Sequence, residues 1–159
     1  MSKPTPLPVD YDSRVDSSNH IERVRVLLGD VISNLQNRAD VHDETKLHSP
    51  EKECFDKYTP LLRGATYGSD EYRGFLEGMG TALEHHYVHN SHHPEHYANG
   101  VYGMSLLDLI EMLVDWKAAS ERHEDGDLLR SIKINQKRYG FDDHLREILV
   151  RTAEELELV

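Results

Sequence analysis

At 159 residues, 30% of them charged, the chain has the size and composition of one folded domain. Its net charge of −11 argues against binding to duplex nucleic acid, because such binding needs a basic surface to contact phosphates. The net charge does not exclude a small anionic substrate. The sequence has no run of 18 apolar residues, so we expect no membrane-spanning helix. The single cysteine, Cys54, fits a reducing cytoplasm.

The N-terminal part of the chain predicts an arm followed by a helix. Residues 1–16 are punctuated by prolines and predict an extended arm, and residues 17–159 predict one helical domain. From Ile21 to Leu35, apolar residues recur at helical spacing. A first helix is therefore expected to begin at residues 17–19 and to end by Asp40.

The rest of the chain also predicts helices. Ser49 as N-cap and Pro50 at the first position start a second helix, which Pro60 and Gly64 close. Further helices are expected over about 69–89, from 105 or 108 past 116, 126–138 and 142–157, with a loop at 90–103. No strand-like alternation of any length occurs. The predicted architecture is all-α, with about six helices around one core.

Six of the eleven histidines lie between residues 85 and 96. Neutral imidazole is the commonest metal-binding side chain in proteins, so this run predicts a metal site. His86 continues the apolar stripe of its helix and so points inward, with His85 as the alternative. His93 precedes Pro94, which holds it out of helical geometry. We interpret the remaining histidines of the run as supporting or exposed residues: His89, His92 and His96.

The doublet His42-Asp43 is a second candidate group. Neighbouring side chains on a helix point about 100° apart, so the two can share a ligand only at a helix end or bend. Lys46, one turn later, is suited to hold a phosphate as a point charge.

Three acidic residues of a later predicted helix, Asp108, Glu111 and Asp115, share one face at spacings of three and four. Bulky apolar residues lie between them, which indicates a partly buried site. We expect Asp115 to be an alternative ligand or a substrate contact, and Trp116 to offer a face on which a nucleobase can stack.

The segment Arg38 to Lys46, with the sequence RADVHDETK, resembles the doublet region of the HD-domain metal-dependent phosphohydrolase superfamily. His93-Pro94-Glu95 is similar to the His-His-Glu segment of its two-metal members. The stretch from Asp108 to Glu111 resembles the downstream aspartate, which a glutamate often follows. The resemblance runs from about residue 20 to 120, and the chain looks like a small branch carried by phages and bacteria.

This resemblance implies a compact HD-like bundle that binds one or two divalent ions. The ligands it implies are His20, His42, Asp43, His85 or His86, His93 and Asp108. His20 fits this set only if the chain folds back between the two segments. In one straight helix, His20 and His42 would lie about 33 Å apart.

The function implied by the resemblance is metal-dependent hydrolysis of a nucleotide or another small phosphorylated compound, in the host cytoplasm if the protein is phage-encoded. The ions would lower the pKa of water and stabilise charge on the phosphoryl oxygens. Lys46 would bind phosphate, and Glu95 or Glu51 would act as general acid or base. Mixed His and carboxylate ligands suit Mn, Fe, Co, Ni or Zn better than Mg.

Two other functions stay open. A few HD-fold proteins hold a di-iron centre that activates oxygen, and the same ligands permit this. Alternatively, the protein is a metal-stabilised module that binds a nucleotide or a protein partner without turnover. The sequence is also compatible with a homo-oligomer.

Overall fold

The computed structural model describes residues 11–66, 68–122 and 126–159. Within these ranges the chain forms six α-helices, three short 3-10 helices and no strand, which confirms the predicted all-α class. None of the described helices is long and apolar enough to span a membrane. The elements in chain order are α1 (Ser13–Val41), η1 (Glu44–Leu47), α2 (Glu51–Gly64), α3 (Asp70–His89), η2 (Pro94–His96), η3 (Gly100–Gly103), α4 (Leu106–Ser120), α5 (Leu128–Tyr139) and α6 (Asp143–Glu155).

The chain divides into two units, Met1–Arg38 and Ala39–Val159. Most of α1 belongs to the first unit, and this helix runs unbroken with no buried residue. It begins at Ser13, four residues before the earliest predicted start at residue 17; residues 1–10 of the predicted arm lie outside the described residues. Most of the apolar residues that predicted α1 are exposed, among them Ile21, Val24, Leu27, Leu28, Val31 and Ile32.

The core of the second unit lies among α4, α5 and α6. Met112 and Leu113 of α4, Ile132 of α5 and Ala153 of α6 are each at most 1% exposed. Each of the three helices begins at a side chain that accepts a hydrogen bond from the backbone, which satisfies a free N–H of the first turn. These N-caps are Ser105, Asp127 and Asp142.

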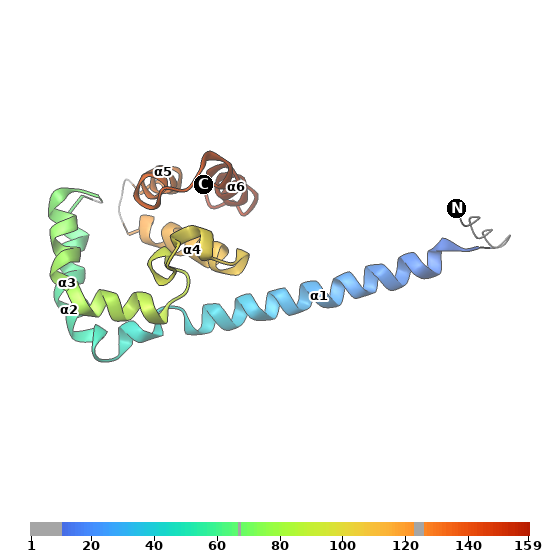
Figure 1. Ribbon diagram of the computed structural model, residues 1–159, viewed down its shortest axis with the longest axis horizontal. Coiled ribbons are helices and arrows are strands. Elements are labelled where there is room, and N and C mark those ends of the chain that lie inside the picture. The colour runs from blue at the N-terminus through green and yellow to red at the C-terminus, as the bar shows by residue number, and fades with distance from the viewer. Residues whose placement is uncertain (1–10, 67, 123–125) are drawn as a thin grey trace. The chain divides into compact units, whose positions relative to one another are not determined.

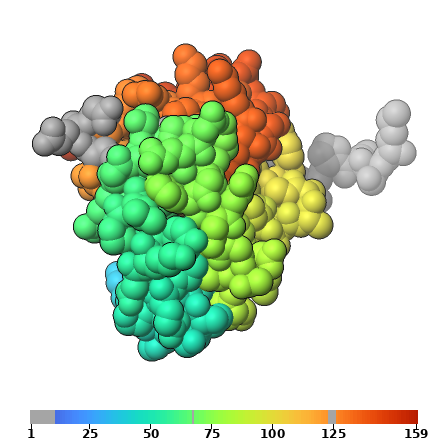
Figure 2. Space-filling view, turned by 90° about the vertical axis from the view of Figure 1, so that its left-hand side faces the viewer, coloured from blue at the N-terminus to red at the C-terminus, as the bar shows by residue number. Residues whose placement is uncertain are grey.

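Helices α2 and α3 lie side by side in the second unit (Figure 1) and together cover one face of it (Figure 2). The predicted start of α2 is wrong in detail, because Pro50 occupies the cap position and Glu51 is the first helical residue. Pro60 lies inside α2 instead of closing it.

A break in α3 at Gly80 positions the histidine run. Gly80 has φ 44° and ψ −120°, a conformation that glycine adopts readily because it has no Cβ. The helix changes direction there, as Figure 1 shows. The part of α3 after Gly80 carries His85 and His86 and leads into the loop that holds His92 and His93.

Candidate metal centre

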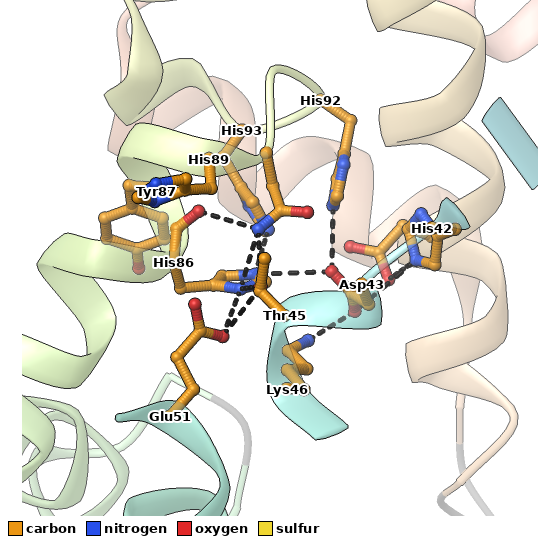
Figure 3. A network of polar contacts seen from close by, with 12 residues as sticks. His42, Asp43, Thr45, Lys46, Glu51, His86, Tyr87, His89, His92 and His93 are labelled. Carbon is orange, nitrogen blue, oxygen red and sulfur yellow. Dashed lines mark hydrogen bonds and ion pairs between the residues drawn. The ribbon is translucent and has the colours of Figure 1, made fainter. Parts of the chain in front are cut away.

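Seven side chains from three parts of the second unit converge on one place. His42 and Asp43 directly follow α1, and His86 lies on α3. His92 and His93 lie in the loop after α3, and Glu111 and Asp115 lie on α4. These side chains form three overlapping groups whose ligand atoms lie within 4.8 Å of one another. The groups are Asp43-His86-His92-His93, His42-His92-Glu111 and His42-Asp43-Asp115. Figure 3 shows the histidines around Asp43.

The His42-Asp43 doublet directly follows the last residue of α1, where a helix end lets neighbouring side chains approach the same place. Asp43 has φ 56° and ψ 16°, a left-handed conformation that aspartate tolerates better than most residues. Its Oδ2 lies 3.4 Å from His42 Nε2 and accepts a hydrogen bond from Lys46. Its Oδ1 lies 3.3 Å from His86 Nε2. Asp43 thus belongs to two of the three groups.

Carboxylates from α4 surround His42. Its Nδ1 lies 2.8 Å from Glu111 Oε1, and its Nε2 lies 3.8 Å from Asp115 Oδ1. Asp115 first, and then Glu111, raise the pKa of His42 to about 10. Burial is the largest single influence and raises the pKa of Asp115, but the hydrogen bond from His42 and the nearby charge of Lys46 together outweigh burial and lower this pKa to about 2. The concentration of negative charge that holds a proton on His42 would equally favour a metal cation.

His86 and His93 face each other in the interior. His86 is 1% exposed, and its Nε2 lies 2.8 Å from Nε2 of His93. Burial is the main cause that lowers the pKa of His93, to about 3, and the neighbouring His92 and His86 lower it further. Burial also lowers the pKa of His86. Both imidazoles are therefore neutral near pH 7, the state in which histidine binds a metal.

Glu51 orients His86 from behind. This carboxylate is fully buried, and its Oε2 lies 2.9 Å from His86 Nδ1, while Thr45 donates to the same oxygen over 3.0 Å. Its Oε1 accepts from His85 Nδ1 at 2.7 Å. A carboxylate that accepts from Nδ1–H leaves Nε2 with its lone pair, and it makes the ring a better ligand. Figure 3 shows Glu51 on the side of His86 opposite Asp43.

His92 completes the cluster. It is 2% exposed, and its Nδ1 lies 3.1 Å from Glu111 Oε1. Its Nε2 lies 3.5 Å from Asp43 Oδ1. Among the described residues, neither of these two buried atoms makes a hydrogen bond. If His92 carries its proton on Nδ1, facing Glu111, its Nε2 is an acceptor, and a divalent ion would satisfy both this nitrogen and Asp43 Oδ1. The residues present therefore fit a metal.

The structure brings together four of the predicted ligands, His42, Asp43, His86 and His93. It adds His92, which we had interpreted as a supporting or exposed residue. From α4 it adds Glu111 and includes Asp115, which we had expected to be an alternative ligand or a substrate contact. Spacing along the sequence does contain a signal for this acidic pair, because residues four apart share a helix face. No comparable signal selects His92, which lies in a loop beside His93.

Asp108 does not belong to the cluster, contrary to the prediction. Its carboxylate accepts hydrogen bonds from Ser91 Oγ and Tyr97 OH, both at 2.8 Å. It also accepts from the backbone N–H and the hydroxyl of Ser105, at 2.8 and 2.7 Å. Ser105 and Asp108 cap each other at the start of α4. Burial opposes these contacts, but they hold the pKa of Asp108 well below its ordinary value. These contacts hold the start of α4 in place.

Other predicted site residues lie outside the described ligand groups. His20 lies on α1, in the first unit, and is in none of the described candidate ligand groups. His85 contacts Glu51 and is in none of the described candidate ligand groups. Glu95 accepts hydrogen bonds from Arg138 and Tyr139 near the end of α5. Glu51 is buried behind His86 and Glu95 is held by Arg138 and Tyr139, so the role of either residue as general acid or base stays a prediction.

A cavity of about 850 Å³ adjoins the cluster. His42, Asp43, Lys46 and Asp115 line it where it meets the candidate ligands. The ammonium of Lys46 contacts Asp43 and lies 5.0 Å from the ring centre of Phe55. Trp116 also lines the cavity, but it is buried and its ring stacks on that of Tyr139, so only part of it faces the space. This cavity is large enough for a nucleotide-sized ligand.

Comparison with known families gives one match. A family model described as "Family of unknown function (DUF5662)" matches residues 10–157. The chain belongs to the DUF5662 family. No curated protein and no solved structure matches it. The match spans both units and every candidate ligand, so the site described above is part of the DUF5662 region.

The contact between Glu51 and His86 leads to a test. Glu51→Gln keeps the side-chain shape but removes the charge that holds His86 Nδ1–H. We expect the affinity for Zn²⁺ or Co²⁺ to fall about 10- to 100-fold without unfolding. Competition with a fluorescent chelator measures this affinity. Glu53→Gln, an exposed change on the same helix, is the control and should leave it unaltered. Equal affinity in wild type and Glu51→Gln would show that Glu51 does not support a ligand.

Proposed function

We propose that this protein is a metal-dependent phosphohydrolase acting on a small phosphorylated compound, with nucleotides as the first class to test. One observation carries the proposal: the His and carboxylate cluster adjoins a cavity of nucleotide size, with Lys46 in the wall beside Asp43. The resemblance to the HD superfamily points the same way, and membership of that superfamily stays a prediction.

The ligand groups suggest how the site is divided. Asp43, His86, His92 and His93 would hold one ion, and His42, Asp43 and Asp115 a second, with Asp43 common to both. Mixed imidazole and carboxylate donors suit Mn, Fe, Co, Ni or Zn, and Mg less well. When bound, such ions lower the pKa of water and neutralise charge on a phosphoryl group.

The chain's own residues would position the substrate. Lys46 presents its ammonium to the cavity next to Asp43, where it can bind a phosphoryl oxygen as a point charge. Glu111 lies within 3.1 Å of both His42 Nδ1 and His92 Nδ1, so it fixes the orientation of two rings at once. Glu51 does the same for His86.

The proposal is tested by measuring phosphate release. The protein is first treated with a chelator and then reloaded with one divalent metal at a time, and iron is added under nitrogen. The substrates are nucleoside monophosphates, sugar phosphates and p-nitrophenyl phosphate. We expect release with at least one of Mn²⁺, Fe²⁺, Co²⁺, Ni²⁺ or Zn²⁺. Lys46→Ala should lower kcat/KM about 10- to 100-fold, the loss expected when a charged hydrogen bond is removed.

Other outcomes would replace the proposal. Stoichiometric metal and ligand binding with no release under any metal would indicate a non-catalytic binding module. Oxygen consumption by the iron-loaded protein, with a mixed-valence iron signal and no phosphate release, would indicate a di-iron oxygenase, which the same donors permit.

A further inference from the structure

Three arginines from separate segments line the cavity: Arg63 near the end of α2, Arg122 after α4 and Arg130 in the first turn of α5. All three are exposed, so they lie at its solvent-facing rim. This group of cations stands out in a chain with a net charge of −11. We call it the arginine rim.

Among the described residues, no ion pair or hydrogen bond engages a guanidinium group of the arginine rim. Six arginines elsewhere do pair with neighbouring carboxylates: Arg14, Arg25, Arg73, Arg138, Arg146 and Arg151. The nearby Asp127 also lines the cavity, but its carboxylate caps α5 by accepting from the backbone N–H of Arg130. The rim therefore presents guanidinium groups that a ligand can engage.

The charges on the cavity wall separate into two sets. Asp43 and Asp115, beside the cluster, are engaged by Lys46 and His42. Among the residues that the structure describes, the rim carries three cations and one carboxylate, Asp127. Many of the other wall residues are apolar or aromatic, including Leu47, Leu62, Tyr72, Trp116 and Ile134, and four carry hydroxyl groups: Thr59, Thr66, Ser120 and Ser131. Such a wall suits a molecule that has an anionic group at each end and a less polar middle.

We propose that the substrate carries a second anionic group, remote from the phosphate that is hydrolysed, and that the arginine rim binds this group. The proposal rests on the proposed function, because it places the first phosphate beside the metal ligands. Arginine binds both phosphate and carboxylate through paired N–H donors. The ligand class is therefore a phosphate ester with a second phosphate or a carboxylate.

The test compares pairs of probes that differ only in the remote group. They are fructose 1,6-bisphosphate with fructose 6-phosphate, adenosine 3′,5′-bisphosphate with adenosine 5′-monophosphate, and 3-phosphoglycerate with glycerol 3-phosphate. Isothermal titration calorimetry on metal-loaded protein measures their affinities. The buffer contains 0.15 M salt, because exposed charges are strongly screened at this ionic strength. The first two pairs test a remote phosphate, and the third tests a carboxylate.

We expect wild type to bind the bis-anionic member of at least one pair about 10-fold more tightly. Single exposed ion pairs contribute little, so the decisive variant combines Arg63→Gln, Arg122→Gln and Arg130→Gln. It should lose this preference while its affinity for the mono-anionic member changes less than 2-fold. Arg151→Gln, on the exposed face of α6, is the matched control and should keep the preference.

The two proposals fail in different ways. If no pair shows a preference in wild type, or if the triple variant keeps it, the arginine rim is not an anion site, whatever the turnover. If the rim-dependent preference is present but no metal supports phosphate release, the rim stands as a binding site and the hydrolase proposal fails.

Discussion

Exchange of Asp43 for asparagine should remove most of the bound metal and abolish any metal-dependent turnover. Asp43 is common to two ligand groups, with Oδ1 3.3 Å from His86 Nε2 and 3.5 Å from His92 Nε2. Asparagine has the same shape and also tolerates the left-handed backbone, so the fold should persist. Metal affinity should fall by more than the roughly 100-fold upper range for loss of a residue that only supports a ligand.

This prediction is tested by the metal content per chain, which is measured by mass spectrometry after dialysis against a weak chelator. Circular dichroism checks that the variant is folded. Asp56→Asn is the matched control, because Asp56 is exposed on α2 and pairs only with Lys52 among the described residues. A folded Asp43→Asn protein with the metal content of wild type would refute the proposed centre.

Predictions that rest on helical periodicity agree with the structure where a residue's place on a helix decides its role. The all-α class follows from apolar spacing, and His86 points inward because it continues the stripe of its helix. The His42-Asp43 doublet needed a helix end, and α1 ends at Val41. In each case a local geometric rule fixes where the side chain points.

The parts of the site that the sequence did not predict depend on contacts between distant segments. Adjacent loop residues such as His92 and His93 have no periodicity, so their burial depends on how α3 and α4 approach each other. Glu51 was predicted as an acid or base, and its contact with His86 could not be predicted because it arises where α2 packs against α3. The sequence analysis chose Asp108 before Asp115 as the metal ligand and overlooked a local signal. Ser105 lies three residues before Asp108, which is the spacing of a capping box.

A second large effect separates stability from metal binding. Asp108→Asn should lower the free energy of unfolding by about 2–4 kcal/mol, because the buried carboxylate accepts four hydrogen bonds and an amide can accept only part of them. Metal content should stay at the wild-type level. Asp115→Asn should do the reverse, with weakened metal binding and a smaller loss of stability. Urea denaturation and metal analysis of both variants test the contrast. Loss of metal by a fully stable Asp108→Asn protein would restore Asp108 as a ligand.

The pH dependence of the Asp108 effect has a definite sign. The hydrogen bonds lower the pKa of Asp108 in the folded protein, so its contribution to stability is fully present above the unfolded value of about 3.9. That contribution is lost as the pH falls towards the folded value. The stability difference between wild type and Asp108→Asn should therefore be constant from pH 7 to 5 and shrink below about pH 4. A difference that grew on acidification would mean that the protonated form of Asp108 is the one the fold stabilises, contrary to a carboxylate that serves only as an acceptor at the start of α4.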